Sequence, residues 1–148
     1  MTDKQSAIAE READIVRLLS SFDDWLSVYS YLIDSTLYLP ALTAEEKKRA
    51  VAVADCQSAT WILVELEGGL VRIKADSEAL IVKGLAGLLV RVFDGQPPDA
   101  VLEADIDFVS KTMLKQNLDS QRTKGLGAMF ETIVRQTRAL RSENNDNA

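Results

Sequence analysis

A pair of glycines at positions 68–69 separates two runs of strand-forming residues, and no other feature restricts the fold as strongly. TWILVELE at 60–67 precedes the pair and LVRIKA at 70–75 follows it, which predicts an antiparallel β-hairpin with a tight turn. Counting outward from the turn places Glu65 opposite Arg72 across the two strands. The apolar positions that then share the opposite face are Val64, Leu66, Val71 and Ile73. Charge pairing and apolar alternation agree on one register, so we expect this hairpin in the folded chain.

Helical patterns occupy most of the chain before the hairpin. Apolar residues recur at helical spacing over residues 7–21. A second helix is expected to begin at an aspartate cap, residue 23 or 24, and to end before Pro40. The sequence TAEE at 43–46 is a capping box that predicts a short charged helix. Residues 51–53 alternate between valine and alanine and predict a further short strand.

After the hairpin, the sequence predicts one buried helix and several others. Ser77 is expected to cap a nearly all-apolar helix that contains Leu80 and Phe93 and that Gly95 and the prolines at 97–98 terminate. Short helices are expected at 99–104 and 108–114, and a long last helix is expected to start near Ser120. Helices therefore flank a small antiparallel sheet of about three strands, which predicts an α+β fold.

Length and charge restrict the class of protein. A chain of 148 residues fits a single domain over residues 1–148, with flexible ends expected near 1–6 and 142–148. The net charge of −6 disfavours nonspecific binding to nucleic acid or to an anionic membrane. The first residues lack the apolar core of a signal peptide, and the most apolar run, 79–93, is too short to span a membrane. We expect a cytoplasmic protein, which a single cysteine also suits.

The chain contains one cysteine, Cys56, and no histidine. Catalytic Cys–His and Ser–His–Asp arrangements and histidine-ligated zinc are therefore excluded. A single thiol also cannot hold an iron–sulfur cluster or complete a CxxC redox cycle. The sequence contains no P-loop and no GxGxxG motif. We therefore expect no metal and no cofactor to be bound by this chain.

Cys56 itself admits two interpretations. Free cysteine is among the most buried residue types, which favours an inert packing role. Position 56, however, lies in a predicted connection between strands and has polar neighbours in Gln57 and Ser58. Connections are where a rigid scaffold displays reactive groups. The residues alone leave both an inert cysteine and a nucleophile open.

Three motifs occur in order along the chain: CQSATWILVEL from Cys56, DSEALIVKGLAGLL from Asp76, and LDSQRTKGLGAM from Leu118. Together with DDWLSVYSYLID at 23–34, they resemble the SufE family of sulfur-acceptor proteins (SufE- and CsdE-like) over almost the whole chain. The resemblance implies a SufE/IscU-like fold and, as partner, a pyridoxal-phosphate-dependent cysteine desulfurase of the SufS or CsdA type. It further implies that the protein stimulates this desulfurase and delivers sulfur to an iron–sulfur scaffold complex.

The resemblance also implies roles for residues around the cysteine. Cys56 is the expected acceptor of persulfide sulfur, and Arg122 is the expected cation that supports its thiolate. Asp55, Gln57 and Ser58 are expected to complete the loop and the sulfur pocket. Asp55 stands where the family has glycine. Aspartate tolerates a left-handed backbone, so the loop shape can be kept, whereas a carboxylate beside a thiol disfavours the thiolate.

Two further residues, Asp76 and Glu78, are expected at the interface with the desulfurase, because the resemblance places this region near the partner-facing surface. The pyridoxal phosphate would belong to that partner. Two alternatives to the carrier remain. One is a regulatory interaction module with an inert, buried cysteine. The other is a thiol peroxidase that uses Cys56 and Arg122, although it would lack a resolving cysteine.

Overall fold

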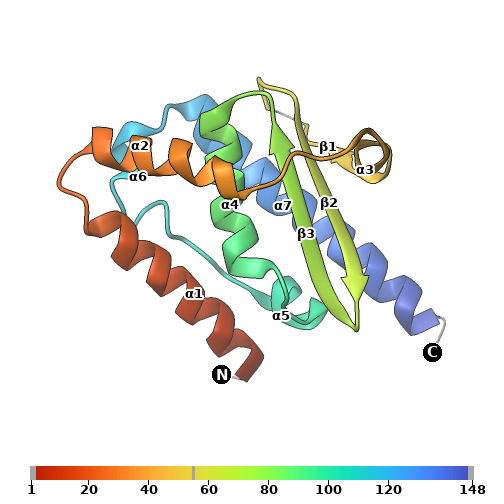
Figure 1. Ribbon diagram of the computed structural model, residues 1–148. Coiled ribbons are helices and arrows are strands. Elements are labelled where there is room, and N and C mark those ends of the chain that lie inside the picture. Colours follow the sequence, from red (N-terminus) through yellow and green to blue (C-terminus); the bar gives the residue numbers. More distant parts are fainter. Residues whose placement is uncertain (1–2, 55, 147–148) are drawn as a thin grey trace.

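The computed structural model describes residues 3–54 and 56–146, which form an α+β fold around one antiparallel sheet (Figure 1). The sheet has three strands in the order β1-β2-β3. Their bounds are β1 Val51–Ala52, β2 Thr60–Glu67 and β3 Leu70–Ser77. The fold class and the small antiparallel sheet that the sequence predicts are therefore confirmed.

The hairpin between β2 and β3 has the predicted turn and register. Gly68 and Gly69 have φ values of 60° and 80°, and positive φ at both central residues is what a two-residue type I′ turn requires. Glu65 is the register partner of Arg72, as predicted. This pairing puts the side chains of Val64, Leu66, Val71 and Ile73 on one face of the sheet, as predicted.

The charged residues of the predicted cross-strand pair form ion pairs with residues outside the hairpin. Glu65 lies 3.4 Å from the Nε of Arg49, and the guanidinium of Arg72 lies 3.4 Å from the Oδ2 of Asp94. Arg49 comes from the helix at 44–49, and Asp94 comes from the segment whose side chain and backbone bond to the edge of β3. The register was therefore predictable from the strands alone, whereas the ion pairs depend on neighbouring elements.

Helices make up most of the remaining chain. Their bounds are α1 Asp3–Ser20, α2 Trp25–Ser35, η1 (a 3-10 helix) Thr36–Tyr38, α3 Ala44–Arg49, α4 Leu80–Phe93, α5 Pro98–Glu103, α6 Leu114–Asn117 and α7 Ser120–Asp146. The ends predicted to be flexible include residues 3–6 and 142–146, which lie in α1 and α7, and their flexibility stays a prediction. No helix within the described ranges combines the length and the apolar character needed to cross a bilayer.

The predicted helix at 108–114 is wrong, because residues 108–113 form turns and only α6 is helical. The side chain of Thr112 explains the difference. Its hydroxyl donates to the carbonyl of Phe108 at 2.9 Å and also accepts from the N–H of Leu114 at 3.3 Å. A threonine hydroxyl that bonds to nearby backbone competes with the regular hydrogen bonds of a helix.

The predicted Ser77 cap is also wrong. Ser77 is the last residue of β3 and pairs with Thr60, whose hydroxyl lies 3.0 Å from its own. Helix α4 begins after Ala79, which has no side-chain capping bond. The Ser77 hydroxyl still accepts from the N–H of Ala79 at 3.3 Å. The strand therefore extends two residues beyond its predicted end at residue 75, because its partner β2 continues there.

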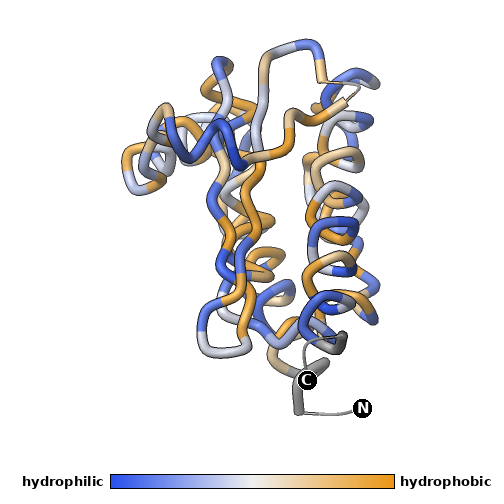
Figure 2. The backbone as a smooth tube through the Cα atoms, turned by 90° about the vertical axis from the view of Figure 1, so that its right-hand side faces the viewer, coloured by the Kyte–Doolittle hydropathy of each residue, from blue (hydrophilic) through white to orange (hydrophobic). Residues whose placement is uncertain are grey.

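One face of the sheet packs against α4 and α7, and the hydrophobic core lies between these layers. Figure 2 shows the strands and the long C-terminal helix as separate layers that carry hydrophobic, orange positions. In this core Phe93 of α4 stacks on Phe130 of α7 with ring centroids 5.5 Å apart. The opposite face of β2 is covered in part by α3, whose Lys47 lies 4.2 Å from the centre of the Trp61 ring.

A side-chain amide of α7 anchors this helix to the sheet. The Oε1 of Gln136 accepts from the N–H of Val64 at 3.1 Å, and its Nε2 donates to the carbonyl of Ile62 at 3.1 Å. The Gln136 amide thus bonds to β2 where its pairing with β1, only two residues long, ends at Ile62. This anchor sets the position of α7 relative to the segment that precedes β2.

Candidate functional site

Cys56 lies on the loop that connects β1 to β2. The loop is closed at its base, where the N–H of Val53 donates to the carbonyl of Thr60 at 2.9 Å. At the end of the loop that leads into β2, the N–H of Glu78 donates to the carbonyl of Ala59 at 3.0 Å. Cys56 belongs to no helix or strand, is half-buried, and carries a free thiol. The reactive candidate therefore lies on a loop held at both ends by the sheet.

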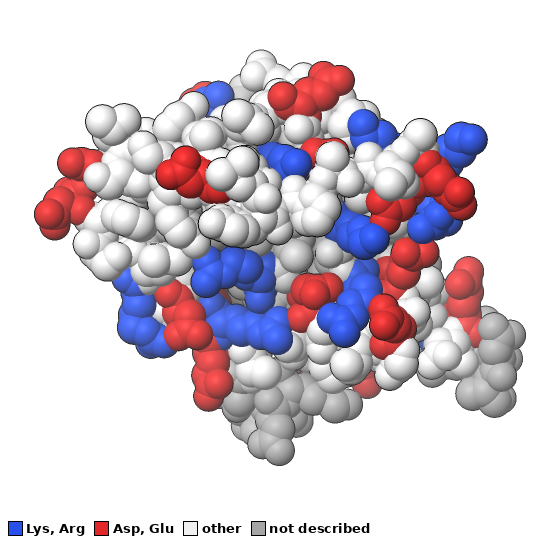
Figure 3. Space-filling model, in the orientation of Figure 1, with Lys and Arg blue, Asp and Glu red and all other residues white. Residues whose placement is uncertain are grey.

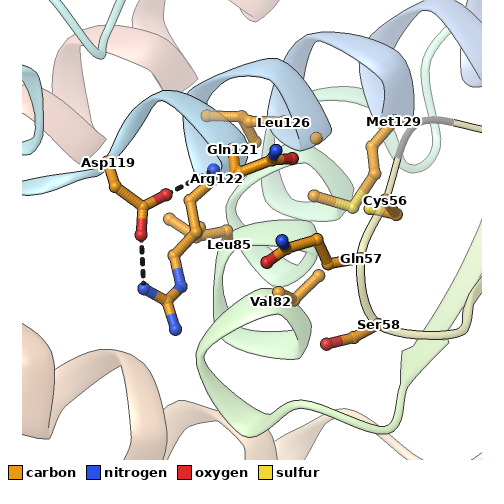
Figure 4. A pocket seen from close by; sticks show the side chains of 11 residues that line it. Cys56, Gln57, Ser58, Val82, Leu85, Asp119, Gln121, Arg122, Leu126 and Met129 are labelled. Carbon is orange, nitrogen blue, oxygen red and sulfur yellow. Dashed lines mark hydrogen bonds and ion pairs between the residues drawn. The ribbon is translucent and has the colours of Figure 1, made fainter.

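The thiol borders a cavity of about 80 Å³ between the loop, α4 and the start of α7 (Figure 4). The lining residues are Cys56, Gln57, Ser58, Val82, Leu85, Asp119, Gln121, Arg122, Gly125, Leu126 and Met129. Apolar side chains from α4 and α7 line one part, and polar and charged side chains line another. A single water needs only about 10–15 Å³ of such volume, so a second sulfur atom bonded to the thiol fits here.

Gly125 on α7 lies close to the thiol. A Cβ atom at position 125 would lie 3.1 Å from the Sγ of Cys56, nearer than ordinary van der Waals contact. Met129, one turn further along α7, lies beside Cys56 in Figure 4 and is buried. Neither residue was predicted from the sequence to belong to the site. The only signal was a glycine inside a predicted helix, in the motif KGLGAM, where glycine is unfavourable.

Arg122 lines the same cavity as Cys56, so the structure brings the two predicted residues to one site. The guanidinium, however, is turned toward Asp119, with its Nη1 3.1 Å from the Asp119 Oδ2 (Figure 4). Asp119 also caps α7, because its Oδ1 accepts from the N–H of Arg122 at 2.8 Å. Among the described residues, Asp119 is the ion-pair partner of Arg122. Support of the Cys56 thiolate by Arg122 stays a prediction.

Three residues were predicted to complete the loop and pocket. Gln57 and Ser58 line the cavity, Gln57 from an exposed position and Ser58 from a half-buried one. The carbonyl of Ser58 accepts from the hydroxyl of Thr60 at 2.9 Å, which ties the loop to the first residue of β2. Asp55 lies outside the described residues. Its predicted effect on the loop and on the thiol stays a prediction.

The two predicted interface residues have opposite environments. The carboxylate of Asp76 is buried, where it accepts from the N–H groups of Leu42 and Ser77 at 3.0 and 2.9 Å. It also lies 3.3 Å from the ammonium of Lys83. Glu78 is exposed beside the end of the Cys56 loop. Asp76 thus fastens the start of α4 to the segment before α3, and Glu78 presents its side chain to solvent.

Figure 3 shows basic and acidic side chains interspersed over the lower part of one face, with a broad uncharged region over α2. That region includes the exposed side chains of Leu26, Leu37 and Tyr38. Within the described part of the chain, no three side chains of the types that bind metals are grouped closely enough to hold an ion.

Residues 13–137 match the sequence model of the family described as "SufE: Fe-S metabolism associated domain". This match covers most of the chain and includes every predicted site residue. A similar solved structure is the solution structure of a hypothetical protein from Thermus thermophilus. It is 25% identical in sequence, with a TM-score of 0.76, and the alignment covers 89% of this chain and 96% of that chain.

Proposed function

The chain belongs to the SufE family of proteins associated with iron–sulfur metabolism, and from this premise we propose that Cys56 is a sulfur acceptor. In this proposal Cys56 takes persulfide sulfur from a pyridoxal-phosphate-dependent cysteine desulfurase, and the protein stimulates that desulfurase. The sulfur then passes to a scaffold on which iron–sulfur clusters are assembled. The protein acts in the cytoplasm as a carrier and a second substrate of the desulfurase.

The half-buried free thiol beside a cavity with room for one more sulfur atom carries this proposal. The apolar part of the cavity, formed by Val82, Leu85 and Met129, suits an uncharged sulfur. The loop that holds Cys56 is bonded to the sheet region at Val53 and Ala59, and Cys56 itself belongs to no strand. These features favour a thiol that a docked donor reaches, in preference to one sealed in the core.

The chemistry needs few groups from this chain. The Cys56 thiolate attacks the outer sulfur of the donor's persulfide, so that a new sulfur–sulfur bond forms on Cys56. The sulfur–sulfur bond of the donor breaks, and the donor cysteine leaves as a thiolate. The outer sulfur keeps its proton, and the proton lost from Cys56 ends on the donor. No external oxidant or reductant takes part, and no histidine is required.

The charged residues have supporting roles in this proposal. Arg122 favours the thiolate when its guanidinium leaves Asp119 and turns to the sulfur of Cys56. A docked partner would promote this change by breaking the exposed Arg122–Asp119 ion pair. Glu78 contacts the desulfurase directly from its exposed position. Asp76 contributes to the interface through the backbone that it positions around residues 76–80.

The test mixes the protein with L-cysteine and a cysteine desulfurase that contains pyridoxal phosphate, followed by intact-mass measurement. The expected result is a mass gain of one sulfur atom on Cys56 that a thiol reductant removes. Cys56→Ser is the control and should gain nothing. The proposal fails if the wild-type protein gains no sulfur while another acceptor protein in the same assay does.

The same assay separates the carrier from a regulatory module. A carrier stimulates desulfurase turnover only through its thiol, so Cys56→Ser should lose the stimulation. Stimulation that persists in Cys56→Ser would show that the protein acts on the desulfurase by binding alone.

A further inference from the structure

Gly125 stands out because nothing in its backbone requires glycine. Among the described residues, the glycines with positive φ are Gly68, Gly69 and Gly95, and Gly125 is not one of them. It lies inside α7, where glycine is less favourable than alanine. The atom nearest to a side chain at this position is the Sγ of Cys56, at 3.1 Å from the missing Cβ. The absent side chain therefore makes the space in which the sulfur lies.

We propose that Gly125 is a positioning residue that sets how far Cys56 is held inward, against α7. The inference rests on the proposed function, since it concerns the same thiol, and it adds a residue that controls access to that thiol. With glycine at 125 the sulfur lies against the helix at the edge of the cavity. With any larger residue the sulfur and the side chain compete for one space.

The loop is the partner that gives way in this competition. Helix α7 is held near position 125 by the buried side chains of Leu126 and Met129, and further along by the Gln136 bonds to β2. Cys56 lies on a loop whose backbone bonds to the sheet region are made by Val53 and Ala59, at its two ends. A close contact forced between a packed helix and a loop moves the loop. An added methyl at 125 thus moves the thiol outward, toward solvent and toward a docking partner.

A neighbouring glycine on the same helix provides a matched control. Gly127 is two residues further along α7, and a Cβ at that position would meet no atom within 4 Å. Gly125→Ala and Gly127→Ala therefore make the same chemical change in the same helix. They differ in whether the new methyl meets the sulfur of Cys56.

The first measurement is the rate at which iodoacetamide alkylates Cys56 in the free protein, followed by mass. Gly125→Ala is expected to react about 5- to 150-fold faster than the wild type, the factor to which a typical overpacking cost of about 1–3 kcal/mol converts. Gly127→Ala is expected to react at the wild-type rate. Equal rates for the two variants would overturn the proposal.

The second measurement is thermal unfolding of both alanine variants, with and without Cys56→Ala. Removal of the sulfur should let Gly125→Ala stabilise the helix as much as Gly127→Ala does, whereas with the sulfur present it should stabilise less. If Gly125→Ala fails to fold, the double variant with Cys56→Ala should fold. If the double variant is no more stable than Gly125→Ala alone, or also fails to fold, the methyl meets something other than the sulfur, and the proposal is then wrong.

Neither measurement uses a desulfurase. If no variant gains sulfur from a desulfurase while Gly125→Ala still exposes the thiol, the carrier function fails and the role of Gly125 stands. If the wild type gains sulfur but Gly125→Ala leaves the alkylation rate unchanged, the carrier function stands and the role of Gly125 fails.

Discussion

The ion pair between Asp76 and Lys83 offers the sharpest test of how the site is held. Its two side chains are only 11% and 12% exposed, so water screens the pair weakly. The Oδ2 of Asp76 accepts from the N–H of Leu42, and the Oδ1 accepts from the N–H of Ser77 and faces the ammonium of Lys83. Three segments therefore converge on one carboxylate: the chain before α3, the end of β3, and the first turns of α4.

Asp76→Asn keeps the shape of the side chain but cannot keep these bonds. An amide has one oxygen acceptor, and its NH₂ group would face an N–H or the ammonium. The variant leaves a nearly buried ammonium without its partner, a change that typically costs about 3–5 kcal/mol. Lys83→Met should cost less, about 1–3 kcal/mol, because the carboxylate keeps both backbone donors. Glu78→Gln, on an exposed neighbour, is the control and should stay within about 0.5 kcal/mol.

The assay is urea unfolding at neutral pH, supported by thermal melts. For a chain of this size about 1 kcal/mol shifts the melting temperature by about 2–4 °C, so Asp76→Asn should melt about 6–20 °C below the wild type. The double variant Asp76→Asn, Lys83→Met should recover part of the loss, since it removes the unpaired ammonium. A loss below about 1 kcal/mol for Asp76→Asn would refute the reasoning, because it would mean that the carboxylate is solvated as an exposed group is.

Two further predictions concern charges elsewhere. Asp119→Asn keeps a good helix cap but releases Arg122, so Cys56 should be alkylated faster than in the wild type. An unchanged alkylation rate in Asp119→Asn would argue against Arg122 as thiolate support. Asp119→Ala also loses the cap and should therefore cost about 0.5–2 kcal/mol more stability than Asp119→Asn. The hydrogen bond from Lys74 is the main cause that lowers the pKa of Glu46 from 4.5 to about 2. A carboxyl group whose pKa is lowered by folding stabilises the fold at pH values above its pKa in the unfolded chain. The stability advantage of the wild type over Glu46→Gln should therefore be full above pH 4.5 and should vanish as the pH falls to about 2. Urea unfolding across this pH range measures it.

Several elements were predictable from the sequence because their causes are local. The Gly68–Gly69 turn, the alternation in β2 and β3, and the Thr43–Glu46 capping box each depend on residues within a few positions of one another. The capping box is present with both of its hydrogen bonds. The pairing of Arg122 with Asp119 was also within reach, because an aspartate three positions before it at a helix start is a cap signal.

Where local reasoning was wrong, a side chain made a bond that the pattern could not reveal. Serine is a common residue at helix caps, but the pairing of Ser77 with Thr60 across the sheet keeps it in β3. Thr112 has acceptable helical spacing, but its hydroxyl satisfies backbone groups in a turn. Hydroxyl side chains are accommodated equally well in caps, turns and strand ends, so the neighbours decide among them.

The sequence by itself determined the α+β class, the hairpin and its register, and the single thiol as the one soft nucleophile, because turn chemistry, periodicity and composition need no knowledge of distant residues. Only the tertiary structure decided that Gly125 lies against Cys56 and that the buried carboxylate of Asp76 pairs with Lys83. The Gly125 and Arg122 contacts to the Cys56 site join segments far apart in the chain. The packing of α4 and α7 on the sheet sets the distances between them, and a periodic pattern reports which face of a helix is apolar without reporting what that face meets.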